Sequence, residues 1–252
     1  MPSAPKYVGG PCPLAISRPL AIFRRLAGHT ALAVAIVGDL SGCVAVSGAQ
    51  PDGGRAQLVS DLASRLTRSG TLTYTAVYRL PQGASATIAQ DRNPNRDAYT
   101  YPGGKLVLTP DSTADCRTTG PSTVCTLTAP PSPDADPAGS LVTEIATRGL
   151  IPPIMVIGLL TAAALESGAV VTADDTTIAG ENATCVHIKG MQNAAASAFD
   201  VCVTTDGLLG SFSGTVSGAQ VDVSLDRYDQ TVTPTAFDLP AGARIVDQRP
   251  RK

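Results

Sequence analysis

The sequence has few of the side chains from which catalytic and metal sites are built. It holds two histidines, His29 and His187, and no tryptophan. No two of its six cysteines have the CxxC spacing typical of zinc sites. Residues 210–214 have the glycine spacing of a hydrolase nucleophile elbow, but Phe212 stands where the serine is needed. We therefore expect no catalytic residues, no metal site and no cofactor.

The sequence also lacks a surplus of basic residues and a membrane-length apolar run. Residues 43–252 hold 15 basic and 20 acidic residues, whereas phosphate backbones bind to concentrated positive charge. The strongly apolar, uncharged stretch 150–165 is 16 residues long and contains two prolines, whereas a spanning helix needs about 20 apolar residues. We therefore expect neither a nucleic-acid partner nor a membrane-spanning helix.

The first 42 residues have the layout of a bacterial export signal. Basic residues come first, followed by an apolar run at 31–38 and by Leu-Ser-Gly-Cys at 40–43. The basic residues are Lys6, Arg18, Arg24 and Arg25. The Leu-Ser-Gly-Cys order resembles the lipobox of bacterial lipoproteins, in which the cysteine is acylated and becomes the new amino terminus. The alternative is an ordinary secretory signal followed by a chance cysteine.

The lipobox resemblance implies lipidation at Cys43 and a lipid-anchored position on the extracytoplasmic face of the cell membrane. The signal 1–42 would then be removed. Residues 43–54 have no periodic pattern and several glycines, so we expect a flexible tether there. Because the basic segment is long for a signal, a start codon downstream of Met1 stays an open alternative.

Four cysteines remain after the signal and the lipidation site, namely Cys116, Cys125, Cys185 and Cys202. An even number in an exported chain favours disulfides, and four cysteines allow three connectivities. We predict the sequential pairing, Cys116 with Cys125 and Cys185 with Cys202. In the two strands that carry them, alternation places Cys185 and Cys202 on the same face, as a cross-strand disulfide requires.

Apolar residues recur at helical spacing in 55–68, and at a spacing of two residues from 71 onward. The patterns predict helices at 55–68, 140–148 and 154–167. They predict strands at 71–80, 84–90, 98–101, 105–109, 123–128, 170–173, 184–189, 199–204, 208–213 and 221–228. Four prolines make 129–139 a loop. We also expect a loop at 118–121, a solvated bend at Asp174-Asp175, and a structural or surface role for His187 in its strand.

This order of elements predicts an α+β fold in a single domain, residues 55–248. One curved antiparallel sheet, an unclosed β-barrel with helices covering its concave face, satisfies both periodicities. The chain resembles the superfamily of Lol-type lipoprotein carriers and the actinobacterial LppX/LprG-type lipid-carrier lipoproteins. The likeness rests on the lipobox, on the helix 55–68 leading into Leu-Thr-Tyr-Thr-Ala-Val-Tyr at 72–78, on the apolar helix 154–167, and on the ending 237–246.

The resemblance implies an apolar cavity under the helices that holds the acyl chains of a lipid or a lipoprotein. The residues expected to line this ligand cavity are Leu72, Tyr74, Tyr78, Ile154, Ile157, Leu160, Val201, Val223 and Leu225. A filled core would need the same alternation, so that alternative stays open. The expected partners are the acyl ligand, the membrane through the lipid anchor, and an envelope protein.

Two other functions remain open at this point. One is a periplasmic sensor or partner-binding module, as in related folds that regulate membrane-bound anti-sigma factors. The other is a hydrolase, for which His187 is the single available imidazole base after residue 42.

Overall fold

The computed structural model describes residues 52–130, 145–146, 148–192 and 194–250. All of them belong to one compact unit, Gly48–Lys252. Cys43, the predicted signal and most of the predicted tether lie outside the described residues, as does most of the helix predicted at 140–148. Within the described residues, no helix is both long enough and apolar enough to cross a membrane.

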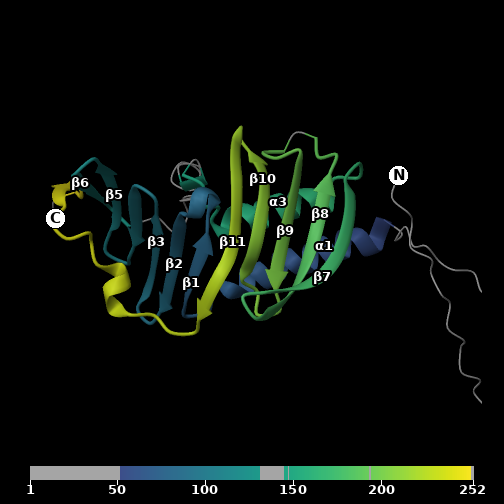
Figure 1. Ribbon diagram of the computed structural model, residues 1–252, viewed down its shortest axis with the longest axis horizontal. Helices are drawn as coiled ribbons and strands as arrows, with labels where there is room; N and C mark the ends of the chain where they lie inside the picture. Colours follow the sequence, from purple (N-terminus) through teal and green to yellow (C-terminus); the bar gives the residue numbers. More distant parts are fainter. Residues whose placement is uncertain (1–51, 131–144, 147, 193, 251–252) are drawn as a thin grey trace, which may run out of the picture. The chain divides into compact units, whose positions relative to one another are not determined.

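Twelve strands form one sheet in the order β12-β6-β5-β4-β3-β2-β1-β11-β10-β9-β8-β7 (Figure 1). Neighbouring strands are antiparallel except β12 and β6, which are parallel. The strands are β1 (Tyr74–Arg79), β2 (Ser85–Arg92), β3 (Asn95–Tyr101), β4 (Gly104–Leu108), β5 (Thr113–Thr119), β6 (Ser122–Thr128), β7 (Val170–Ile178), β8 (Glu181–Lys189), β9 (Ala198–Thr204), β10 (Leu209–Val216), β11 (Ala219–Asp229) and β12 (Arg244–Asp247). The edge strands β7 and β12 do not pair with each other, so the curved sheet stays open and the predicted α+β class is confirmed.

Two helices, α1 (Asp52–Ser69) and α3 (Pro153–Leu165), pack against each other on one face of this sheet (Figure 1). We call this the inner face. In α1, the buried side chains Val59, Leu62 and Leu66 recur at helical spacing, which gives the helix one apolar side. The end of α1 is fixed by the buried amide of Gln90 in β2, which donates to the carbonyl oxygens of Ser69 at 2.7 Å and Leu72 at 2.6 Å.

The opposite, outer face carries a smaller apolar cluster. Ala89, Ala98, Val107 and Ala114 from β2 to β5 are buried there beneath Phe237 of the short 3-10 helix η2 (Pro234–Phe237). The guanidinium carbon of Arg96 lies 4.1 Å from the centre of the Phe237 ring, which adds a cation–π contact. The ending 234–237 therefore packs against the outer face.

Three segments differ from the sequence prediction. The expected loop 118–121 belongs to a β5–β6 hairpin that turns at Gly120, where φ is +57°. Asp174 and Asp175 lie inside β7 and do not form a bend. Strand β12 was not predicted. These strands expose mostly polar side chains, so they lack the apolar alternation by which a strand is recognised in the sequence.

Both predicted disulfides are present. Cys116 lies directly opposite Cys125 in the β5–β6 pair, and Cys185 lies directly opposite Cys202 in the β8–β9 pair. The sequence separations are 9 and 17 residues. Each bond ties two neighbouring strands on the outer face. Val186 and Val201, next to Cys185 and Cys202, point into the core, and Cys116 stands two residues after Ala114 of the outer cluster. The disulfides therefore brace the sheet without crossing the interior.

Helix α1 lies very close to Gly207, in the turn between β9 and β10. This glycine has φ +90°, and a Cβ atom built on it would collide with the main-chain oxygen of Arg65 in α1. Gly218 has a similar φ of +84°, but nothing lies within 4 Å of its Cβ position. We expect Gly218→Ala to cost about 1 kcal/mol of unfolding free energy through backbone strain, and Gly207→Ala to cost about 2 kcal/mol more. Urea unfolding of both variants measures this difference; equal losses would show that α1 does not approach this turn closely.

Candidate functional site

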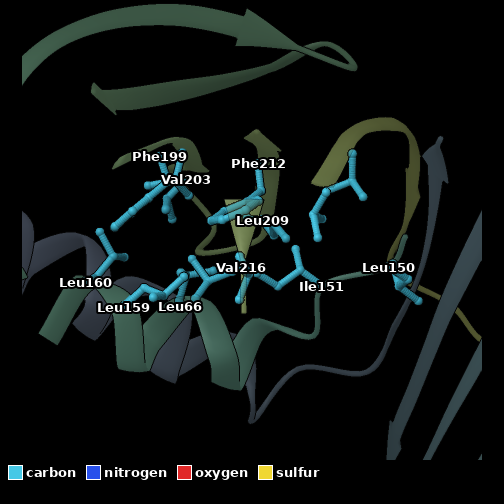
Figure 2. Close-up of a cluster of buried hydrophobic side chains, with 14 of the residues drawn as sticks. Leu66, Leu150, Ile151, Leu159, Leu160, Phe199, Val203, Leu209, Phe212 and Val216 are labelled. Atoms are coloured by element: carbon cyan, nitrogen blue, oxygen red, sulfur yellow. The ribbon is translucent and has the colours of Figure 1, made fainter. Parts of the chain in front are cut away.

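The space between the helices and the inner face is occupied by one continuous apolar cluster. It is built from α1, α3, the segment before α3 and most of the strands. In Figure 2, Leu160 points from α3 toward Phe199 and Val203 of β9. The ring of Phe199 stacks on that of Phe212 in β10, with centroids 5.7 Å apart. The buried side chains of α3 and those of the sheet meet in this cluster.

The residues predicted to line a ligand cavity mostly gather in this cluster. Eight of the nine contribute to it: Tyr74, Tyr78, Leu160, Val201, Val223 and Leu225 are buried, and Leu72 and Ile157 are partly buried against them. Ile154 differs, because it is 53% exposed on the outer side of α3 and is not part of the buried surface. The helical spacing alone did not indicate which side of so apolar a helix faces the sheet.

Helix α3 is apolar on every side. Its 13 residues include no charged residue, and Thr161 is its single polar side chain. The Thr161 hydroxyl donates back to the Ile157 carbonyl oxygen at 2.7 Å, within the helix itself. The side chains of α3 therefore hold it to the sheet by apolar contacts. A helix of this composition is normally buried all round, yet Ile154 and Leu165 at its two ends are exposed.

The inner face also carries a buried hydroxyl group. Tyr78 in β1 is 1% exposed, and its hydroxyl has no hydrogen-bond partner in the part of the chain that the structure describes. Burial raises the pKa of Tyr78 well above its ordinary value, with smaller contributions from Tyr74 and Tyr99. The phenol is therefore a neutral donor in an apolar interior. A polar atom entering beside Tyr78 would gain this hydrogen bond.

A recess of about 360 Å³ opens at one end of the cluster. It is lined by Leu72, Thr73, Asp206, Tyr228 and Gln230. Leu72 belongs both to this recess and to the margin of the apolar cluster. The Tyr228 ring lies 6.1 Å from that of the buried Tyr74. The recess therefore lies at the margin of the apolar cluster, and its size is at the lower end of small-molecule sites, which span about 300–1,000 Å³.

A second group of polar side chains lies on the outer face, around His187. Its Nδ1 is 2.8 Å from Asp200 Oδ1, and its Nε2 is 2.8 Å from Asp174 Oδ1. Since carboxylates only accept hydrogen bonds, both ring nitrogens donate when the ring is protonated. The two carboxylates, Asp174 first, raise the pKa of His187. A hydrolase base would need one free nitrogen, so this arrangement stabilises three strands rather than prepares a catalytic imidazole.

Sequence reasoning missed this His187 cluster and the unpaired Tyr78 hydroxyl. Asp174 and Asp200 are each 13 residues from His187 and meet it only through strand pairing. The single available signal was that Asp200 and His187 fall on the same side of their strands as the cysteines. Among the described residues, no group of three or more His, Cys, Asp or Glu side chains could hold a metal ion.

Comparison with known proteins gives limited similarity. No protein-family model and no curated protein matches this chain. An uncharacterized conserved protein from Thermus thermophilus is 12% identical with a TM-score of 0.42, covering 76% of this chain and 100% of that chain. MucB is 12% identical with a TM-score of 0.42, covering 75% of this chain and 66% of that chain. A DUF1329 family protein from Desulfovibrio piger is 9% identical with a TM-score of 0.25, covering 73% of this chain and 97% of that chain. Likenesses this low carry no inference about what this chain binds.

The unpaired hydroxyl predicts the effect of Tyr78→Phe. A buried hydroxyl without a partner costs about 1–3 kcal/mol, so its removal should raise the free energy of unfolding by up to that amount. Chemical denaturation of the two proteins measures the change. If Tyr78→Phe is instead destabilising by about 1 kcal/mol or more, the hydroxyl makes a hydrogen bond in solution.

The His187 cluster predicts a pH dependence of stability. Because the folded state raises the pKa of His187 above 6.5, the stabilisation is fully present below that pH and is lost as the pH rises through the raised value. We expect the stability advantage over His187→Gln to be largest below pH 6.5 and to fall as the pH rises through the raised pKa of His187. The double variant Asp174→Asn, Asp200→Asn should lose this pH-dependent part. A difference that stays constant with pH would contradict the assignment.

Proposed function

We propose that this chain is a membrane-anchored extracytoplasmic lipoprotein that binds or carries an acyl lipid, or the acyl chains of a lipoprotein, between α3 and the inner face of the sheet. Lipidation at Cys43 would supply the anchor. The function is binding and transfer, and it needs no catalytic group. The observation that carries the proposal is the uncharged helix α3, which lies on a continuous apolar surface and holds to it through apolar side chains.

Acyl chains could replace the contacts between α3 and the sheet at little cost in free energy. Its buried residues, Val156, Leu159, Leu160 and Ala163, would cost about 1.5–3 kcal/mol for each large side chain if they moved into water. An acyl chain that enters beneath them replaces one apolar neighbour by another, so this cost largely disappears. Each methylene that leaves water contributes about 0.8 kcal/mol, so about ten methylenes contribute about 8 kcal/mol.

Two polar features support a place for the polar part of such a ligand. The recess beside Leu72 and Tyr228 is large enough for a headgroup but too small for two acyl chains in addition. Inside the cluster, the unpaired Tyr78 hydroxyl offers a donor to an ester or amide carbonyl. A lipid with its headgroup in the recess and its chains under α3 would use both features.

Native mass spectrometry of a chain beginning at Gly48 tests this proposal. The delipidated protein is incubated with a membrane lipid extract and transferred to mild ionisation conditions. We expect an added mass of one acyl lipid. Ile157→Glu places a carboxylate at the margin of the apolar cluster and should lower lipid occupancy about tenfold or more, because a charge near acyl chains is costly to desolvate.

Gln57→Glu is the matched control, because it adds the same charge on the exposed side of α1. It should leave lipid occupancy unchanged. A native chain that stays lipid-free after incubation would refute lipid binding. A stable protein complex recovered by crosslinking, with no lipid bound, would instead support the sensor or partner-binding module.

A further inference from the structure

The exposed apolar residues at the carboxyl end of α3 lie beside the start of α1. Leu165 is 83% exposed at the end of α3, and Val170 is 60% exposed at the start of β7. Between them, the Ser167 and Ala169 carbonyl oxygens accept hydrogen bonds from the Arg55 guanidinium, at 3.4 and 2.5 Å. Arg55 belongs to the first turn of α1. The chain from the amino terminus therefore enters the domain next to Leu165 and Val170.

The length of the preceding chain places this end near a membrane if Cys43 is acylated. Cys43 stands nine residues before Asp52, where α1 begins. An extended chain spans at most about 3.6 Å per residue, so the start of α1 lies within about 32 Å of the lipid anchor. An anchored domain can therefore rest with this end on the bilayer surface.

The charges around the exposed pair fit an anionic bilayer. Lys189 of β8 pairs with Val170 across the strands and is exposed. Both side chains point to the outer face of the sheet, because the next residue, Val171, packs against the core. Arg55 reaches the same corner from the helix side, through the Ser167 and Ala169 carbonyl oxygens. Glu166 adds one negative charge next to Leu165, and its carboxylate accepts a hydrogen bond from the Gly168 backbone N–H at 3.3 Å. The two cations therefore exceed the one carboxylate among these three side chains. Apolar side chains that enter the headgroup region, with cations at their side, are the features of an interfacial membrane contact.

We infer that Leu165 and Val170, at the corner of the domain where Lys189 and Arg55 also lie, form a docking surface for an anionic lipid bilayer and bring the carboxyl end of α3 to the membrane. This inference rests on the proposed function, because a carrier has to meet the bilayer from which it takes its ligand. Docking at this end presents α3, the element whose contacts acyl chains would replace, to the lipid source. The occupant is the bilayer surface, and neither a second copy of the chain nor another protein is required.

A single tryptophan tests the docking surface, because the native sequence has none. Leu165→Trp and Ile245→Trp are each introduced into the chain beginning at Gly48, a compact unit that holds all described elements and both disulfides. Ile245 is the matched control: it is also a large exposed apolar residue, 48% exposed, but in β12 at the other edge of the sheet. Vesicles of equal parts phosphatidylglycerol and phosphatidylcholine are then added. Emission from Leu165→Trp should shift to shorter wavelength, and emission from Ile245→Trp should not.

Vesicle flotation gives a second readout. Leu165→Glu should lower the vesicle-bound fraction about tenfold, whereas Ile245→Glu should leave it unchanged. No vesicle binding by the native chain, or equal changes at both positions, would overturn the inference. A native chain that dimerises through Leu165, seen as a halved mass for Leu165→Glu in light scattering, would also overturn it. Lipid occupancy by native mass spectrometry is measured on the same samples, so that loss of docking with occupancy retained is separated from failure of lipid binding itself.

Discussion

The contact between α3 and the inner face of the sheet is the interaction on which the rest of this structure depends. The side chains of α3 are apolar except for Thr161, and the helix rests on Phe199, Phe212 and their neighbours. Apolar contact is strong but not directional. Under the proposed function, it would hold the helix in the empty protein and also accept acyl chains as substitutes, which a network of buried ion pairs would not allow without leaving charges unpaired.

The outer face has the opposite character. There the disulfides and the contacts of His187 with Asp174 and Asp200 tie neighbouring strands together. Covalent and charged contacts of this kind have fixed geometry, and they leave the interior unconstrained. The disulfides thus brace one side of the sheet, while α3 is held to the other side by apolar packing. Under the proposed function, this division would let α3 yield to a ligand while the sheet stays fixed.

Much of the fold could be predicted from the sequence, because strands with one buried side alternate clearly. The alternation that placed Val201 in the core also placed Cys202 on the same face as Cys185, in agreement with the sequential disulfide pairing. The polar strands β5 and β12 and the second half of β7 could not be predicted, since they are held by their neighbours and not by apolar alternation. For the candidate site, the sequence indicated which residues gather under the helices. It could not indicate that Ile154 faces outward or that the Tyr78 hydroxyl lacks a partner, because both depend on the packing of elements far apart in the chain.

The central claim is that α3 can separate from the inner face while the sheet stays folded, and that acyl chains then bind between the two. Hydrogen exchange of backbone amides measures this directly, with and without added dioleoyl phosphatidylglycerol. In the lipid-free protein, the amides of α3 should exchange through an opening that is smaller than global unfolding, while those of β9 and β10 exchange only globally. Added lipid should change the protection of α3 and leave the outer strands unaffected. If α3 exchanges only by global unfolding, and lipid alters none of its amides, the account is contradicted.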